Sequence, residues 1–144
     1  MSLLETALAT LLDASLGVWL GSIVFFSLVG APTTFDVLGD DAGRVVNAIF
    51  PKYYSFGAIL GLVAVAAALV VGVGPYDGVL LAALPLVGVA LNLYARQVLI
   101  PKMDRAGDDG FAKYHKQSVA LNGATIFAVA AGLVVSHLQV ALYF

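Results

Sequence analysis

Four long apolar stretches, nearly free of charged side chains, constrain this chain more than any other feature of its sequence. They cover roughly residues 12–29, 53–73, 79–100 and 117–144. A helix needs about 20 apolar residues to cross the hydrocarbon core of a bilayer, and each stretch approaches or exceeds that length. Backbone polar groups in hydrocarbon must be paired, and the stretches are too long for strands of a barrel. The sequence therefore predicts an all-α fold, an integral membrane four-helix bundle.

The composition agrees with a membrane protein that forms one domain over residues 1–144. Hydrophobic residues make up 61% of the chain and charged residues only 11%, whereas soluble domains average about 45–50% and about 25%. The net charge of −2 gives no general attraction to nucleic acid, so none is expected as a partner. The first charge is Glu5 and the apolar stretch that follows is long, so we expect a retained helix rather than a signal peptide.

The basic residues fall at two junctions and predict the topology. Arg44 and Lys52 lie between the first and second stretches. The others lie at the junction of the third and fourth stretches: Arg96, Lys102, Arg105, Lys113 and Lys116. Segments rich in Lys and Arg stay on the cytoplasmic side of a membrane. We therefore expect a multi-pass protein of the cell membrane with both junctions in the cytoplasm and both termini outside, as an even number of spans requires.

The first junction is expected to contain a short helix that lies in the membrane interface. Asp40 or Asp41 suits its N-cap, and most of the apolar side chains between residues 45 and 50 fall on one face. Pro51 then suits the first turn of the second transmembrane helix. The sequence thus predicts a separate interfacial helix between the first two transmembrane helices.

Glycine-rich segments predict turns and close helix packing. Segments 72–78 and 107–110 combine Gly with Pro or Asp, which favours tight turns at the second and third connections. GxxxG patterns at residues 17–21 and 57–61 are typical of membrane helices in close contact. Packing within one bundle and contact between two copies of the chain both explain these patterns.

We expect the helix that contains the fourth stretch to begin near Phe111, and polar side chains gather on one face of its half nearer the basic junction. His115, Ser118 and Asn122 follow each other at helical spacing, and Asn92 and Arg96 are one turn apart in the third stretch. Polar groups that face lipid are costly, so both sets should face the bundle interior and can meet there. One hypothesis is a binding site for an anion or a polar head group, with His115 able to change charge near neutral pH. The other is a set of interhelical hydrogen bonds that fixes the packing.

Metal, haem and catalytic chemistry find little support in the sequence. His115 and His137 are 22 residues apart, which is about 33 Å along a helix, so they cannot ligate one iron within one chain. Copper lacks soft ligands, because the chain has no Cys and only two methionines. Asp13 and His137 are suited to a solvated pair at the outer side. Because no hydrolase, kinase, P-loop or zinc pattern occurs, we expect no cofactor, no metal site and no enzymatic activity.

Several short motifs occur in an order that resembles the transmembrane protein 205-like family. They are LGSIVFF at 20–26, APTTF at 31–35, AG at 42–43, FPKYY at 50–54, and then Phe111, His115, Ser118 and Asn122. This resemblance covers most of the chain and implies a four-helix membrane domain of unknown function. It supplies no agreed activity and no catalytic residues. The association of some members with drug or metal tolerance suggests transport or trafficking only loosely.

Two functions therefore remain as expectations, because nothing specific in the sequence supports a third, a redox or lipid enzyme that uses a bound cofactor. In the first, the protein binds or moves a small solute, an anion or a lipid along the polar face formed by Asn92, Arg96, His115, Ser118 and Asn122. In the second, it is a non-catalytic structural or assembly subunit of a larger membrane complex. Membrane lipids are the expected partners, together with a second copy of the chain or other membrane proteins.

Overall fold

The computed structural model describes residues 2–71 and 77–143, with side chains placed for all of these except 77, 107–109, 111–112 and 139–143. The described elements are all helical, and they follow in order: α1 (Leu3–Phe25), η1 (Phe26–Gly30), α2 (Ala31–Leu38), η2 (Gly39–Asp41), α3 (Ala42–Val71), α4 (Asp77–Tyr94), η3 (Ala95–Leu99) and α5 (Ile100–Tyr143). The expected all-α class is confirmed for this part of the chain. The turn expected at 72–78 falls largely outside the described residues.

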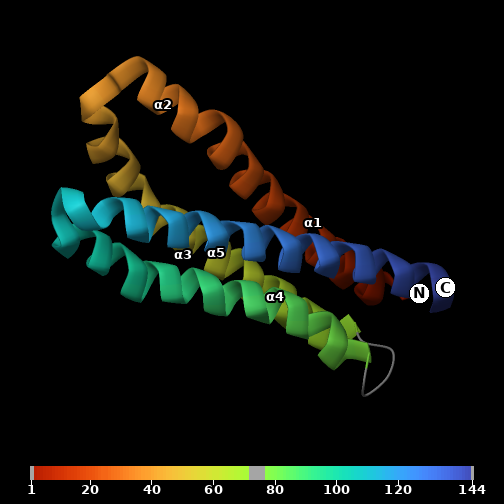
Figure 1. The fold of residues 1–144 in the computed structure, drawn as a ribbon. Coiled ribbons are helices and arrows are strands. Elements are labelled where there is room, and N and C mark those ends of the chain that lie inside the picture. Colours follow the sequence, from red (N-terminus) through yellow and green to blue (C-terminus); the bar gives the residue numbers. More distant parts are fainter. Residues whose placement is uncertain (1, 72–76, 144) are drawn as a thin grey trace.

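Three helical runs within the described ranges are long and apolar enough to cross a membrane: Leu3–Val71, Gly78–Ala106 and Lys113–Leu138. The sequence predicted four spans. The first two are joined here because the backbone stays helical through η1, α2 and η2, although the chain turns back on itself near Gly39 (Figure 1). Gly39 has a φ of +53°, a left-handed conformation that glycine adopts readily.

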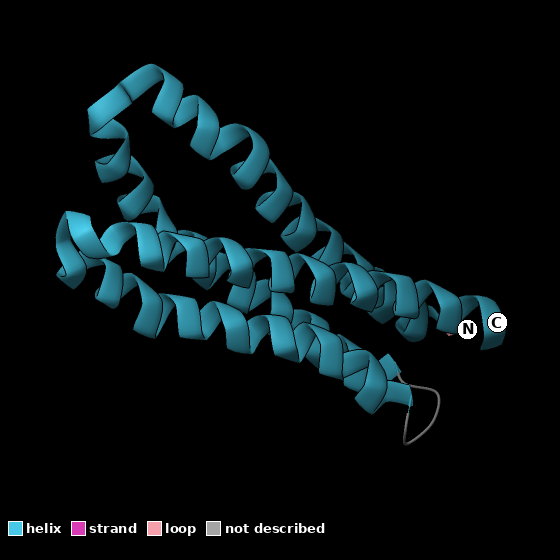
Figure 2. Cartoon of the chain, viewed as in Figure 1, coloured by secondary structure: helices cyan, strands magenta, loops and turns pink. Residues whose placement is uncertain are grey.

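The four longest helices pack side by side. Helix α3 contacts α1 and α4, and α5 contacts α4 and α1. Figure 2 shows the same arrangement, with the N- and C-terminal ends together at one end of the molecule. The helices diverge at the opposite end, where α1 continues into η1 and α2 (Figure 1).

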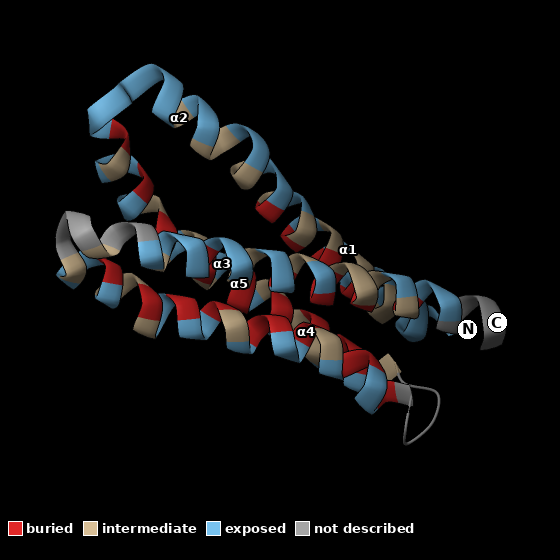
Figure 3. Ribbon diagram, viewed as in Figure 1, coloured by how far each residue is buried: buried red, intermediate tan, exposed pale blue. Residues whose placement is uncertain are grey.

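The core is densest where α1, α3 and α4 meet, and buried residues face inward there (Figure 3). Trp19 is 1% exposed and lies against glycines of both neighbouring helices. A side-chain carbon added at Gly57, Gly61 or Gly88 would collide with the Trp19 ring. The GxxxG pattern at 57–61 therefore serves packing within one chain, whereas a carbon added at Gly17 would meet no described atom within 4 Å.

The separate interfacial helix expected before Pro51 is not found. Helix α3 runs without a break from Ala42 to Val71, with Pro51 inside it. A proline within a helix removes one hydrogen bond and bends the axis, and Figure 1 shows the first part of α3 at an angle to the rest. In this first part, Val46 and Phe50 are buried against Ala95 and Leu99 of η3.

The tight turn expected at 107–110 is also not found as such. The backbone remains helical through these residues, and α5 already begins at Ile100. The chain nevertheless reverses direction at this end of the bundle, so that most of α5 lies beside α4 (Figure 1). Glycine is required in this bend, because a side-chain carbon at Gly110 would collide with the Cβ of Ala106.

Two short π-helices lie near the expected ends of the first and third apolar stretches. Each is five residues long, and each is followed at the second position by a proline, Pro32 or Pro101. A proline ring clashes with the carbonyl four residues earlier. A π-helix, with its i→i+5 hydrogen bonds, adds one residue to the turn and accommodates that clash.

Candidate binding cleft

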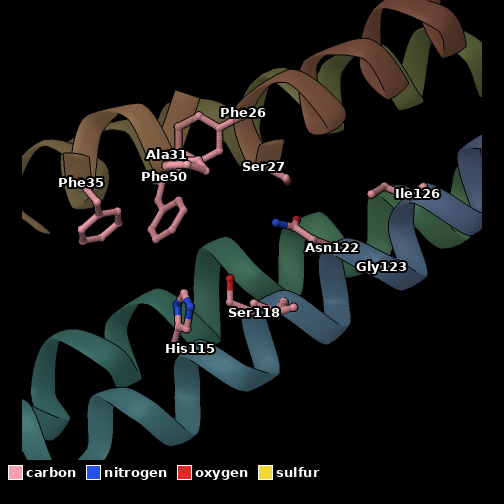
Figure 4. Close-up of a pocket in the computed structure, with 12 residues that line it drawn as sticks. Phe26, Ser27, Ala31, Phe35, Phe50, His115, Ser118, Asn122, Gly123 and Ile126 are labelled. Carbon is pink, nitrogen blue, oxygen red and sulfur yellow. The ribbon is translucent and has the colours of Figure 1, made fainter. Parts of the chain in front are cut away.

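A cleft of about 460 Å³ opens between α5 and the segment formed by η1 and α2, which we call the arm (residues 26–38). Figure 4 shows aromatic side chains of the arm and of α3 on one side, and α5 on the other. The residues that line it are Phe26, Ser27, Ala31, Pro32, Phe35, Phe50, His115, Ser118, Val119, Asn122, Gly123 and Ile126. We refer to this space as the cleft.

The cleft exists because the arm leaves the bundle. Helix α1 is anchored in the core up to Ile23, which is 1% exposed, but no residue of η1, α2 or η2, all of which are described, is buried. Phe26 holds the start of the arm on α3, with ring centroids 6.0 Å from Phe50 and 5.1 Å from Tyr53. Beyond that aromatic contact the arm and α5 enclose open space.

One wall of the cleft is apolar and aromatic. Phe26, Phe35 and Phe50 face the cleft from the arm and α3, and Val119 and Ile126 contribute from α5. Such a wall favours contact with hydrocarbon, because apolar surface gains free energy of roughly 25 cal/mol for each Å² removed from water. This side of the cleft has no charged group among its described lining residues.

The other wall carries three polar side chains along α5. His115, Ser118 and Asn122 lie at successive turns and point toward the arm in Figure 4. The hydroxyls of Tyr54 and Ser118 are hydrogen-bonded at 3.1 Å, and the Tyr53 hydroxyl donates to Oδ1 of Asn122 at 3.4 Å. These bonds fix the polar wall to α3, so that the cleft has both donors and acceptors at defined positions.

The structure brings together three of the five residues that the sequence analysis singled out. Asn92 is 3% exposed and donates to the Tyr54 carbonyl at 3.4 Å, so it lies in the core behind the cleft. A side-chain carbon at Gly57 would collide with both Asn92 Nδ2 and Trp19 Nε1, and Trp19 Nε1 is buried with no hydrogen-bond partner among the described atoms. Arg96 is exposed and does not line the cleft.

Sequence reasoning missed the aromatic wall. Phe26, Phe35 and Phe50 lie in motifs that were noticed, LGSIVFF, APTTF and FPKYY, but the first span was expected to end near residue 29. Only the continuation of the helix through Pro32 shows that Phe26 and the APTTF motif lie on one arm. The order of these motifs along the chain is visible in the sequence, but their arrangement in space is not.

A second polar cluster joins α1 and α5 at the end of the bundle where the termini lie. The Ser136 hydroxyl donates to Oδ1 of Asp13 at 2.6 Å, and Nε2 of His137 lies 3.9 Å from Oδ2 of Asp13. The expected proximity of Asp13 and His137 is therefore found, with Ser136 as an additional member. Within the described residues, no group of three or more His, Asp or Glu side chains is placed to hold a metal ion.

The outer surface and the helical runs together define the class of this protein. Large apolar side chains are widely exposed, Phe127 by 76%, Val37 by 74% and Leu28 by 72%. An exterior of this kind suits hydrocarbon rather than water. Combined with three runs of membrane-spanning length, it indicates a helical membrane protein.

Comparison with known proteins gives the family. The model of a domain of unknown function, DUF4149, matches residues 14–112, and the chain therefore belongs to that family. An uncharacterized protein of Aquifex aeolicus (strain VF5) is 33% identical over 117 residues, covering 78% of this chain and 84% of the relative. No solved structure matches. The expected membership of a family without an assigned activity is confirmed, and its matched region includes the arm and Phe50.

Proposed function

We propose that this protein crosses the cell membrane with α1, α3, α4 and α5 and binds a single-chain amphiphile in the cleft. The observation that carries the proposal is the pairing of an aromatic wall with the polar side chains His115, Ser118 and Asn122 across one space. An amphiphile has both parts, an apolar chain for the first wall and a polar head group for the second. Small-molecule sites commonly have this character, mostly apolar with a few placed polar groups.

The size of the cleft supports one chain rather than two. A methylene group occupies about the volume of a water molecule in the liquid, about 30 Å³. A cleft of about 460 Å³ therefore accommodates a chain of about fifteen such groups. A phospholipid with two chains of that length exceeds this volume, so a fatty acid or a similar single-chain molecule fits better.

Charge at the same end of the molecule favours an anionic head group. Lys113 and Lys116 are exposed on α5 within one turn of His115. By the positive-inside rule, this end of the bundle is the cytoplasmic one and both termini are outside. The proposed ligand thus enters sideways from the bilayer, with its head group toward the cytoplasmic interface.

The proposed role is binding or movement of the amphiphile and includes no catalytic step. The narrower resemblance to the transmembrane protein 205-like family fits this role, since tolerance of toxic compounds is compatible with the movement of amphiphiles. The alternative, a non-catalytic assembly subunit, predicts that the cleft is covered by another protein chain. In that case added amphiphile should not bind to the purified protein.

A larger side chain in the cleft tests the proposal, and the same substitution at the next residue is the control. Ile126→Trp places a larger side chain in the cleft, whereas Phe127→Trp changes the next residue, which is 76% exposed on the outer surface. We expect native mass spectrometry to detect one palmitate bound to the wild type and to Phe127→Trp, and at least tenfold less on Ile126→Trp. Equal occupancy of the three proteins, or none on any, would remove the cleft as the binding site.

A further inference from the structure

Two short patterns occur in the same order in the first and second halves of the chain. In the first half α1 leads into a five-residue π-helix at Phe26–Gly30, and in the second α4 leads into another at Ala95–Leu99. Each π-helix is followed at the second position by proline, and the offset between Pro32 and Pro101 is 69 residues, the same as between the two π-helices (95 − 26 = 69). A helix, a π-helix and an X-Pro step thus occur twice in the same order.

A second motif follows in both halves. Residues 50–54 read FPKYY and residues 111–115 read FAKYH, at an offset of 61. The connection before the motif is therefore eight residues shorter in the second half (69 − 61 = 8). In each half the motif precedes a long helical segment, which is the remainder of α3 or of α5.

The repeat makes two helix interfaces equivalent. With α1 corresponding to α4, and α3 to α5, the contact of α4 with α3 corresponds to that of α1 with α5. The first interface is closed, because a side-chain carbon added at Gly57 or Gly61 of α3 would collide with Asn92 or Val89 of α4. In the second, α1 and α5 also contact each other, but the cleft opens beyond that contact, between α5 and the continuation of α1 into the arm.

The two π-helices show the same difference. Ala95 and Leu99 of η3 are buried, 0% and 1% exposed, in a cluster with Phe50 and Tyr54 of α3. Their counterparts at the 69-residue offset, Phe26 and Gly30 of η1, are only partly buried and line or adjoin the cleft. In the second half, the π-helix η3 therefore packs on α3. In the first half, the cleft separates the π-helix η1 from α5.

We infer that the arm is hinged at η1 and closes over the cleft by packing on α5 as η3 packs on α3. The inference deepens the proposed function, since the arm would regulate access to the same cleft. Many membrane transporters are built from internal repeats, and one repeat moves against the other during transport. Here the packed half supplies the geometry of the closed arm.

Two anchors on α1, both before η1 in the chain, restrict the motion to the cleft end. Trp19 and Ile23 hold α1 in the core just before the π-helix. The bond from Ser136 to Asp13 holds α1 to α5 at the far end. A π-helix beside a proline and a glycine is a place where a helix bends easily. In η1 no residue is buried, so no side chain there fixes the arm in the core.

Distances between paired spin labels test the inference, and the chain has no native cysteine to remove. Thr33→Cys and Lys113→Cys flank the cleft, on the arm and on α5. Lys102→Cys and Lys52→Cys are the equivalent positions in the closed interface, at the same offsets of 69 and 61, and all four residues are exposed. Double electron–electron resonance is measured on both pairs in phosphatidylcholine nanodiscs, with and without palmitate.

We expect one narrow distance distribution for the control pair, and for the cleft pair two populations, of which palmitate enriches one. A single distribution for the cleft pair, as narrow as that of the control and unchanged by palmitate, would overturn the hinged arm. Two populations that do not respond to palmitate would support the arm and count against palmitate as the ligand of the proposed function. The hinged arm and the binding of palmitate are therefore contradicted by different results.

Discussion

At the scale of single residues, the polar groups of this protein divide by what surrounds them. Asn92 is buried behind the cleft and hydrogen-bonded to α3. Asn122 accepts a hydrogen bond from Tyr53 and also lines the cleft. Both amides looked equivalent in the sequence, one on each of two apolar stretches. Asn92 therefore serves packing, whereas ligand contact is proposed for Asn122.

Asn122→Leu should weaken palmitate binding several-fold, because it replaces the cleft amide with an apolar group of similar size. It also removes the acceptor of the Tyr53 hydroxyl, which should lower the free energy of unfolding by about 1 kcal/mol. Gln117→Leu is the matched control, since Gln117 is exposed on the same helix and does not line the cleft. Equal palmitate affinity of the two variants, measured by titration in detergent, would contradict the role given to Asn122.

Gly57→Ala should destabilise the fold by about 1–3 kcal/mol, the usual cost of overpacking, because the added carbon collides with Asn92 and Trp19. Gly17→Ala adds the same carbon on α1 where no described atom lies within 4 Å, and alanine is the better helix former. Thermal unfolding in detergent should therefore rank Gly17→Ala at or above the wild type and Gly57→Ala below it. The reverse order would be inconsistent with the packing described for Trp19.

At the scale of helices, the differences between sequence and structure arise where proline and π-helical turns change the register. Asn92 and Arg96 were expected on one face because they are four residues apart. Arg96 lies at the start of η3 and is exposed, and the buried residues that follow Asn92 are Ala95 and Leu99 instead. The inward face of α5 was predictable because His115, Ser118 and Asn122 lie in a regular α-helical stretch. The divergence of the arm was not, since it depends on contacts that the arm lacks.

Pro32→Ala should straighten the arm by restoring a backbone donor and removing the clash that η1 accommodates. The distance distribution of the Thr33→Cys and Lys113→Cys pair should then narrow to one population. Pro101→Ala is the matched control in the second half, where Ala95 and Leu99 keep η3 packed, so the Lys102→Cys and Lys52→Cys pair should not change. An unchanged two-population distribution in Pro32→Ala would argue against η1 as the hinge.

At the scale of the whole molecule, composition and charge placement dictate more than any single motif. An all-helical apolar chain with exposed Phe, Val and Leu side chains has few alternatives to a membrane bundle. Whether its helices leave a cleft was not predictable, because that depends on a small difference between two related interfaces. Gly57 and Gly61 close one of them, and the separation of the arm leaves the other open.

Topology is the first whole-molecule prediction. Because all Lys and Arg residues gather at the junctions between residues 44 and 52 and between 96 and 116, Arg105→Cys should be protected from a membrane-impermeant thiol reagent in intact cells. Ser2→Cys, near the other end of the bundle, should react. Preferential external labelling at position 105 would reverse the proposed orientation.

The central claim is that an amphiphile occupies the cleft, and the place where a photoreactive palmitate attaches tests it most directly. The purified protein is irradiated with palmitate that carries a diazirine near the end of its chain, and the modified residues are located by peptide mass spectrometry. We predict that attachment concentrates on the arm and on α5 between Ser118 and Ile126, and that unlabelled palmitate competes for it. Attachment spread evenly over exposed outward residues such as Leu69, Leu86 and Phe127, without competition, would contradict the account.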